Sequence, residues 1–468
     1  MALLDPDRLF PAEMQARGLA RDIYAGIKDL PIVSPHGHVD PAWFARNEPF
    51  SDASELIVIP DHYVTRMLVS QGITLDQLGV PRRDDHVAET DRRAIWRLFA
   101  ANYHLFRATP SRMWLDHVFA ELFGFTERLS ATTADGYFDA IGAALVTDAF
   151  RPRALFDRFG IEVLATTESP LDDLRHHRAI RASGWNGRVV TTYRPDAVVD
   201  PEVREFAANI EAFGAIAGCD ATTWAGYLEA HRRRRAAFRE MGATATDHGH
   251  ASAFTCVLSD SDAAGLFNRA LTGRITADEA ERFRGHMLVE MARMSLEDGM
   301  VMQLHPGSRR NQSARVFDDF GADRGFDIPG PTDYVRALRP LLDEVGHRSD
   351  FTLILFTLDE TAMSRELAPL AGVYPCLRLG PAWWFYDSAE GMRRYRLIVT
   401  ETAGFYNTVG FNDDTRALCS IPARHDVARR VDAAFLAELV TTGRLAEDEA
   451  HEVAYDLTYR LAKQAYRL

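Results

Sequence analysis

The stretch that decides the fold is LPIVSPHGHVD, residues 30–40. Its first half, Leu30–Ser34, is an apolar run of strand length, and His36 and His38 follow it directly. Side chains two residues apart on an extended segment point to the same side, so the two imidazoles face one way. Imidazole binds zinc and other first-row divalent ions well, so the pair can form the floor of a metal site. The alternative is that the two histidines occur by chance on a polar loop. The H-x-H motif by itself would favour that alternative, but the apolar strand directly before it argues against it.

Seven more runs of this kind follow along the chain. They are Ile161–Thr166, Arg188–Tyr193, Ala243–Thr246, Met300–Leu304, Thr352–Thr357, Tyr374–Leu379 and Tyr406–Phe411. Amphipathic helical stretches such as Pro201–Ala217 and Ala277–Asp298 separate most of them, an alternation typical of parallel βαβ units. With 468 residues, the chain also has the length of a barrel with insertions. The sequence therefore predicts the α/β class and a (β/α)8 barrel of the TIM type.

The interval between the first two runs is far longer than one crossover helix. It contains helical patterns of its own, including Arg92–Asn102 and Arg112–Leu122. We therefore expect residues 40–154 to form a helical subdomain inserted after strand one, and residues 1–39 and 155–468 to form the metal-binding barrel. Active sites of such barrels lie at the carboxyl ends of the strands, where this insertion would form a roof over the site.

Composition excludes several classes of partner. The net charge of −14 argues against nucleic acid and against anionic membrane surfaces, although a local arginine cluster can still bind an anionic substrate. The four cysteines are far apart and form no C-x-x-C pair, and the amino terminus has no secretory pattern. No apolar run is long enough to span a bilayer. We expect a cytoplasmic homo-oligomer that acts on a small molecule.

Lysine occurs only as Lys28 and Lys463, and neither lies in the predicted barrel interior. Schiff-base catalysis, pyridoxal phosphate and a carbamylated lysine that bridges two metals all need a lysine in the site. These chemistries are therefore disfavoured. The sequence contains no convincing P-loop, no G-x-G-x-x-G and no G-x-S-x-G pattern, so a nucleotide cofactor and a serine nucleophile have no support.

Polar residues follow the last predicted strand, which neighbours strand one in a closed barrel. Asp414 can complete a His-His-Asp metal site or act as a general base, and Arg416 lies two residues further on. The alternative is a helix N-terminal turn, since Asp413 and Thr415 are good capping residues.

Other strand ends supply further candidates. His305 follows strand five, with a buried structural histidine as the alternative, and the same caution applies more strongly to the histidines after strand four. Arg194 and Arg310 can bind an anion, or they are solvated surface residues. One of Trp383 and Trp384 can line a cavity, because adjacent tryptophans cannot both face one core; an ordinary packed loop is the alternative.

These motifs, taken in order, resemble the uronate (glucuronate) isomerases of the amidohydrolase superfamily. The resemblance covers nearly the whole chain. It rests on residues 30–40, Pro60-Asp61-His62-Tyr63, Arg194-Pro195-Asp196, Leu304-His305-Pro306-Gly307 with Arg310-Asn311, Trp383-Trp384, and Asp414-Thr415-Arg416. It implies aldose–ketose isomerisation of D-glucuronate to D-fructuronate and of D-galacturonate to D-tagaturonate, in hexuronate catabolism.

From the resemblance and the residues together we expect one divalent metal, zinc first and manganese second, held by His36, His38 and Asp414. We expect Asp414 to move the proton from C2 to C1 through a cis-enediol, with Tyr63 and Arg416 as further catalytic residues. The residues expected to bind substrate are His62, Arg194, His305, Arg310, Trp383 and Trp384. Two alternatives remain: a mononuclear metal-dependent hydrolase of the amidohydrolase type, and a barrel that only binds ligands.

Overall fold

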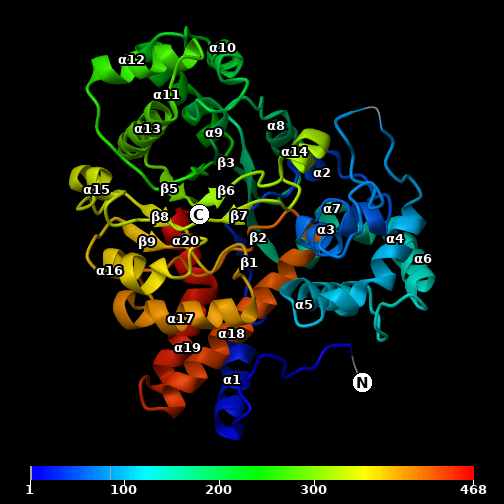
Figure 1. Ribbon diagram of the computed structural model, residues 1–468. Helices are drawn as coiled ribbons and strands as arrows, with labels where there is room; N and C mark the ends of the chain where they lie inside the picture. The colour runs from blue at the N-terminus through cyan, green and yellow to red at the C-terminus, as the bar shows by residue number, and fades with distance from the viewer. Residues whose placement is uncertain (1–2, 85) are drawn as a thin grey trace.

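The computed structural model describes residues 3–84 and 86–468 (Figure 1). Its centre is a curved sheet of seven parallel strands in the order β1-β2-β3-β4-β5-β8-β9. The strands are β1 (Ile32–Ser34), β2 (Ile161–Glu168), β3 (Val189–Tyr193), β4 (Ala245–His248), β5 (Val301–Leu304), β8 (Leu353–Leu355) and β9 (Leu377–Leu379). Each falls within or overlaps one of the predicted runs, so the parallel α/β architecture is confirmed. A small antiparallel pair, β6 (Ser308–Arg309) with β7 (Ile328–Pro329), was not predicted.

The eighth predicted strand, Tyr406–Phe411, is wrong as a strand. Thr408 donates from both its backbone N–H and its hydroxyl to the carbonyl of Phe405, so the chain turns where an extended segment was expected. One parallel bridge remains, between Leu379 and Thr408. The segment nevertheless runs alongside β9, because Val409 N–H donates to the Leu379 carbonyl at 3.0 Å.

The strands bury both faces because helices cover one face and the end of the chain covers the other. The outward side chains of Met302 and Leu304 belong to one apolar cluster with helices that lie above, beside and below the sheet in Figure 1. These helices are α9 (Asp196–Val199), α10 (Phe206–Ala217), α11 (Trp224–Glu240), α12 (Asp260–Leu271), α13 (Ala277–Asp298), α15 (Arg339–Val345), α16 (Ala368–Ala371) and α17 (Ala389–Ala403). Helices α8 (Arg175–Ala182) and α14 (Ala314–Phe320) pack in a second apolar cluster. Alternation of side chains along the strands puts Val301 and Ile354 on the other face.

That other face packs against the carboxy-terminal helix α20 (Leu461–Tyr466). Tyr466 is fully buried in one cluster with Val301 and Ile354, and its hydroxyl donates to Gln303 Oε1 at 3.1 Å. Figure 1 shows this red helix running into the middle of the sheet. The end of the chain therefore fills the space that the curved sheet encloses.

Helix α13 shows how local sequence sets an element. Thr276 and Glu279 form a reciprocal capping box at its start, which satisfies backbone N–H groups that the helix itself cannot pair. The helix ends at Gly299, whose φ of +79° suits a residue without Cβ. Its bounds, Ala277–Asp298, are those predicted from the sequence.

Between β1 and β2 the chain is helical, as the sequence predicts for this interval. The helices are α2 (Pro41–Arg46), α3 (His62–Val69), α4 (Arg92–Ala101), α5 (Pro110–His117), α6 (Ala134–Leu145) and α7 (Pro152–Arg158), to the right of the sheet in Figure 1. Short 3-10 and π segments lie among them, including Ser54–Val58, Tyr103–Phe106 and Val118–Leu122. Trp96, Phe99 and Phe119 are fully buried in an aromatic core that belongs largely to this segment.

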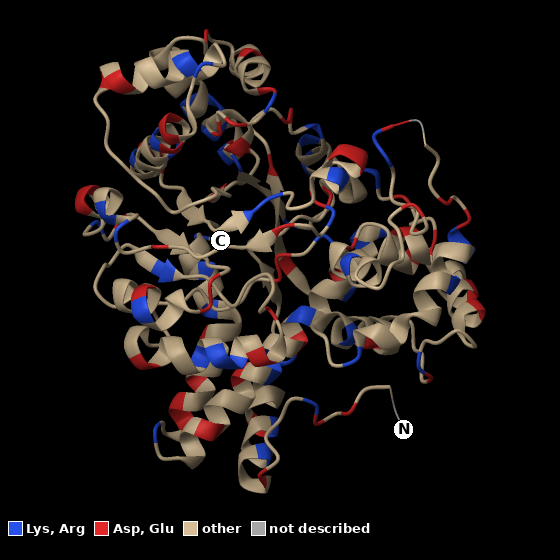
Figure 2. Ribbon diagram, viewed as in Figure 1, with Lys and Arg blue, Asp and Glu red and all other residues tan. Residues whose placement is uncertain are grey.

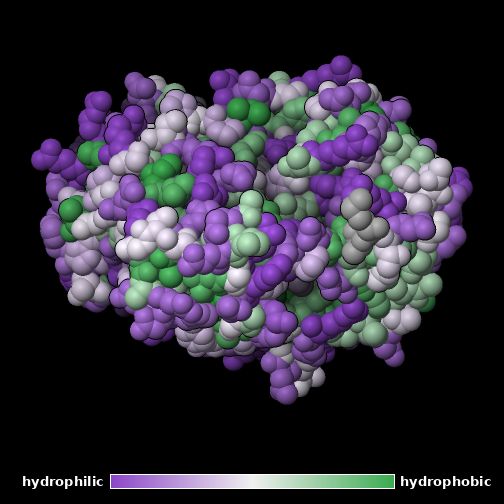
Figure 3. All heavy atoms as spheres, turned by 90° about the horizontal axis from the view of Figure 1, so that it is seen from below, coloured by the Kyte–Doolittle hydropathy of each residue, from purple (hydrophilic) through white to green (hydrophobic). Residues whose placement is uncertain are grey.

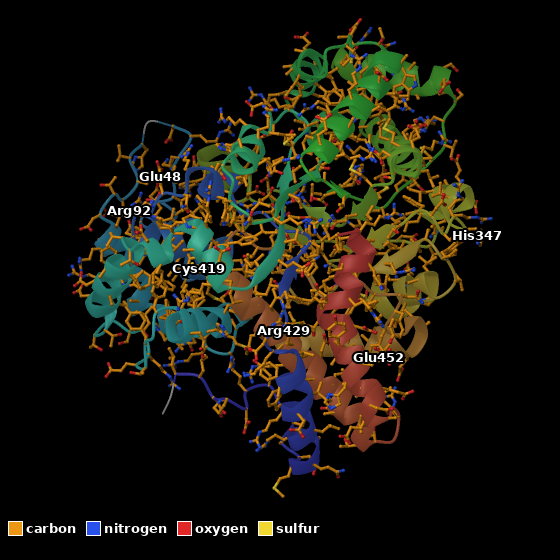
Figure 4. All side chains as sticks on the ribbon, turned by 180° about the vertical axis from the view of Figure 1, so that it is seen from behind. Glu48, Arg92, His347, Cys419, Arg429 and Glu452 are labelled. Carbon is orange, nitrogen blue, oxygen red and sulfur yellow. The ribbon has the colours of Figure 1, made fainter. Side chains whose placement is uncertain are left out.

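The two ends of the chain are tied together below the sheet. Helix α1 (Met14–Ile27) packs against α18 (Ile421–Thr441) and α19 (Glu447–Tyr455) through a shared apolar cluster. Arg429 on α18 donates to the carbonyls of Lys28 and Leu30 at 2.6 and 2.8 Å, and Figure 4 labels it beside this part of the chain. These bonds fix the approach to β1 and hence the position of the H-x-H motif.

The surface carries both signs of charge, with acidic and basic residues interspersed over the helices (Figure 2). Seen from below, hydrophilic side chains alternate with small apolar areas (Figure 3). Among the described residues, none of the helices combines the length and the hydropathy of a membrane span.

Candidate active site

A cavity of about 660 Å³ lies at the carboxyl ends of the strands. Its wall contains all eleven residues that the sequence predicted for the site: His36, His38, His62, Tyr63, Arg194, His305, Arg310, Trp383, Trp384, Asp414 and Arg416. Most of them lie in the loops that directly follow strands of the sheet. These loops open at one end of a parallel sheet, which explains why residues so distant in sequence meet in one cavity.

His36, His38 and Asp414 meet around one carboxylate oxygen. Asp414 Oδ1 lies 3.4 Å from His36 Nε2 and 3.1 Å from His38 Nε2. Ligands about 2.0–2.1 Å from a tetrahedral metal lie roughly 3.3 Å from one another, so these separations fit one ion. Asp414 reaches this place with a φ of +40°, uncommon for a residue with Cβ, and the Trp383 indole N–H donates to its other oxygen.

The protonation states also suit a cation. Burial alone would raise the pKa of Asp414, but the facing His36 and His38 outweigh burial and lower it well below the ordinary value. Burial lowers the pKa of His38, which favours the neutral imidazole that metals bind. Within the predicted triad, His38 can therefore offer a neutral nitrogen and Asp414 an anionic oxygen.

His305 belongs to the same group through Asp247. Its Nδ1 lies 2.6 Å from Asp247 Oδ1, and its ring stacks on that of His36 with centroids 4.7 Å apart. Its Nε2 and the Nδ1 of His36 are buried and have no hydrogen-bond partner among the described residues. A carboxylate on one ring nitrogen and a free second nitrogen is the usual setting of a metal-binding histidine. His36, Asp247 and His305 thus form a second possible ligand set, and we call His36, His38, His305 and Asp414 the histidine group.

Asp247 was passed over in the sequence, where only its position at the end of strand four marks it. The two histidines that follow it, His248 and His250, do not line the cavity. His248 is fully buried, with Nε2 3.0 Å from Thr246 Oγ1. The structural alternative therefore holds for His248.

Four arginines line the cavity, and each is already paired with a carboxylate of the chain. Arg194 donates through Nε to Asp196 at 2.8 Å and its Nη1 lies 3.1 Å from Asp247. The other pairs are Arg310 with Asp327 at 2.8 Å, Arg416 with Asp323 at 3.0 Å, and Arg424 with Asp387 at 3.1 Å. We call these four the arginine group. Eight aspartates line the same wall, so with neutral histidines the wall is negative overall.

His62 and Tyr63 begin helix α3 at the cavity wall. The Asp61 side chain caps this helix by accepting from the Tyr63 backbone N–H at 2.8 Å. The His62 ring meets the edge of Trp384 with centroids 5.4 Å apart. Burial, followed by the charge of Arg416, lowers the pKa of His62 to about 3, so this ring is neutral at pH 7.

Two residues that the sequence did not reveal complete this corner. Tyr63 donates its hydroxyl to Asp387 Oδ2 at 2.8 Å, and Arg424 Nη1 donates to the same oxygen at 3.1 Å. Asp387 lies in the loop after β9, eight residues beyond Leu379, and Arg424 lies in the first turn of α18. Position after a strand is the signal that could have found Asp387; nothing local marks Arg424.

Comparisons with known proteins identify the family of the chain. Residues 12–466 match the family model described as glucuronate isomerase. Over 468 residues the chain is 64% identical to the uronate isomerase of Mesorhizobium japonicum, with all of both chains covered. The glucuronate isomerase structure from Caulobacter crescentus superposes with a TM-score of 0.98 at 59% identity, covering 100% of this chain and 98% of that one. The uronate isomerase structure from Thermotoga maritima gives 0.92 at 26% identity and 99% of both chains. The chain is thus an enzyme of the glucuronate isomerase family.

Proposed function

We propose that the cavity binds a six-carbon uronate and interconverts D-glucuronate with D-fructuronate and D-galacturonate with D-tagaturonate. The observation that carries this proposal is the meeting of His36, His38 and Asp414 with Tyr63 and Arg416 at one cavity wall. The test is incubation of the purified protein with D-glucuronate and a ketose assay. Formation of the ketose is expected, whereas no conversion after zinc or manganese is supplied would overturn the proposal.

The hydrolase alternative would use the same histidine group to activate water. The relatives described above are isomerases by name, and the corner formed by His62, Tyr63 and Asp387 has no evident use in hydrolysis. We therefore favour the isomerase.

We propose that one divalent ion is held by His36, His38 and Asp414, with His305 as a neighbouring ligand and zinc preferred to manganese. The buried Nε2 of His305, which has no partner among the described residues, supports this proposal, because such an atom costs free energy unless a ligand satisfies it. When bound, the ion supplies positive charge that offsets the acidic wall and favours an anionic substrate.

Asp414 is the proposed base. Its lowered pKa keeps it ionised at neutral pH, and one carboxylate can lift the C2 proton and return it to C1 on the same face of a planar cis-enediol. Tyr63 lines the same cavity, and its phenol would donate a hydrogen bond to the oxygen that gains negative charge, without adding charge to the ground state. Arg416 completes the electrostatic stabilisation of that intermediate.

Arg194 is the proposed partner of the C6 carboxylate, with Arg310 next in line. A guanidinium has five N–H donors, and among the described residues Arg194 uses only its Nε–H in a hydrogen bond, to Asp196, while Asp247 lies at ion-pair distance. Its charge, however, is already shared between two carboxylates, which weakens its attraction for a third. His62, His305, Arg416 and the Trp383-Trp384 pair would contact the sugar hydroxyls and C–H faces.

The architecture around the site is also part of the proposal. Pro60, Asp61 and Trp114 line the cavity from the interval between β1 and β2, which supports the view that residues 40–154 form an inserted roof. The segment 406–415 bonds to Leu379 on one side and, through the Thr415 carbonyl, to His38 N–H at 3.0 Å on the other. This placement supports the proposal that the segment occupies the eighth strand position and closes the barrel between β9 and β1. A homo-oligomeric, cytoplasmic protein remains a prediction.

A further inference from the structure

Tyr63 does not offer its hydrogen to the cavity. A phenol has one hydrogen, and here it lies on the bond to Asp387 Oδ2. Both side chains are buried, with Tyr63 7% and Asp387 8% exposed. Burial, and then the charge of Asp387, raise the pKa of Tyr63 well above the ordinary value, so the phenol keeps its proton at neutral pH.

Asp387 is itself held by a buried cation. Arg424 Nη1 donates to the oxygen that accepts from Tyr63, and Arg424 also donates to the Asp413 carbonyl at 3.3 Å. The guanidinium carbon lies 3.6 Å from the centroid of the Trp114 ring, within cation–π distance. Arg424 therefore fixes Asp387 from one side while Tyr63 contacts it from the other.

A second buried pair shows what a purely structural ion pair looks like in this protein. Arg396 holds Asp432 with two parallel bonds of 2.6 and 2.9 Å, one to each carboxylate oxygen. Asp387 is used differently, because Arg424 and Tyr63 share Oδ2 while Oδ1 is buried without a partner among the described residues. Asp387 and Arg424 line the cavity, whereas Arg396 and Asp432 do not.

We propose that Asp387, held by Arg424, is a positioning residue for the isomerisation and acts through Tyr63. In the free enzyme it binds the phenolic hydrogen and fixes the phenol oxygen at the cavity wall. Arg424 donates to the same carboxylate oxygen, which weakens the hydrogen bond from Tyr63 to Asp387. Tyr63 can then turn its hydroxyl hydrogen toward a substrate oxygen that becomes negative. This inference rests on the proposed function and adds a residue pair that the sequence did not indicate.

The test is a double-mutant cycle on the full chain with D-glucuronate as substrate, using Asp387→Asn, Tyr63→Phe and the double variant. We expect Asp387→Asn to lower kcat by about tenfold to a hundredfold with little change in KM, because small misplacements of a reacting group cost rate on that scale. In the Tyr63→Phe background the same substitution should cost nothing further, since there is no hydroxyl left to position.

The matched control is Asp432→Asn, which also removes a carboxylate from a buried arginine. Both Asn variants should unfold at a lower temperature, but Asp432→Asn should keep the parent kcat. If Asp387→Asn does not fold, Asp387→Glu retains the charge beside Arg424 and enters the same cycle.

The outcomes separate this inference from the proposed function. No ketose from the unsubstituted protein would remove the proposed function. An active parent in which Asp387→Asn costs the same factor with and without the Tyr63 hydroxyl, or costs nothing, would overturn the positioning role alone. Full activity of Tyr63→Phe would remove Tyr63 from the mechanism and the role of Asp387 with it.

Discussion

The histidine group and the arginine group line one cavity but differ in how far the protein chain completes them. Buried ring nitrogens of His36 and His305 have no hydrogen-bond partner among the described residues, whereas each arginine of the other group is paired with a carboxylate. Unpaired buried polar atoms are costly, so the histidine group, through His305 Nε2, has a place for the proposed ion. The arginine group is complete by itself, so an anionic substrate has to share it with the chain's own carboxylates.

This difference predicts that a change at Asp414, in the histidine group, acts on the chemical step, and that a change at Arg194 or Arg310, in the arginine group, acts on binding. The largest effect is expected at Asp414. Asp414→Asn should lower kcat by about 10²–10⁴, the range for loss of a general acid–base group, because an amide cannot take up the C2 proton. Steady-state kinetics with D-glucuronate measure this. A kcat within threefold of the parent would show that another group removes the proton.

The second effect concerns metal content. His36→Ala removes a ligand from both possible ligand sets and should abolish stoichiometric binding of one divalent ion, measured by elemental analysis after dialysis against zinc. The matched control is His347→Ala, an exposed histidine that Figure 4 labels at the surface. Equal metal content in the two variants would place the ion elsewhere.

The third effect tests the arginine group. Arg194→Met should raise KM for uronates by roughly tenfold to over a hundredfold, because a charge-assisted pair is worth on the order of 1.5–3 kcal/mol. The competition of Asp196 and Asp247 for this guanidinium argues for the lower end of that range. An unchanged KM would move the carboxylate anchor to Arg310, whose own substitution is the next measurement.

The smallest effect lies outside both groups and concerns stability. Burial raises the pKa of Glu168 to about 8, against opposing hydrogen bonds from Thr191 and Thr166. The folded protein then holds a proton that the unfolded chain releases near pH 4.5, so its stability falls as pH rises from about 4.5 to about 8. Glu168→Gln should remove this fall, on the order of a few kcal/mol, in urea unfolding at pH 5 and pH 8. An exposed control, Glu121→Gln, should show the same fall of the free energy of unfolding with pH as the parent. If Glu168→Gln also shows this fall, the carboxyl of Glu168 is ionised in the folded protein and the account is contradicted.

Much of the fold follows from local patterns. Seven apolar runs form strands, and helix α13 keeps its predicted bounds because caps and turn glycines act within a few residues. The strand prediction at 406–411 is wrong because the apolar composition gives no sign of the turn, in which Thr408 donates hydrogen bonds back to the Phe405 carbonyl. The packing of α20 against the inner face of the sheet was not predicted, because a contact between Tyr466 and Val301 leaves no periodic signal in either segment.

The candidate site also has a part that the sequence predicts and a part that it does not. Residues directly after strands, such as His36, Arg194 and His305, could be predicted because every parallel strand delivers its next residues to the same edge. The side chains with which the site residues pair could not be predicted in this way. Asp387 and Arg424 come from different loops and helices, and their pairing depends on three-dimensional packing that sequence spacing does not encode.

The measurement that tests the central claim most directly is the isomerisation of D-glucuronate in D2O, followed by NMR of the ketose. Proton transfer by Asp414 through a cis-enediol predicts deuterium at C1, at least in part, because a shielded base returns some of the original proton. Complete conversion with no deuterium at C1, even after long incubation with excess enzyme, would contradict the account and leave a hydride shift between C2 and C1 as the mechanism.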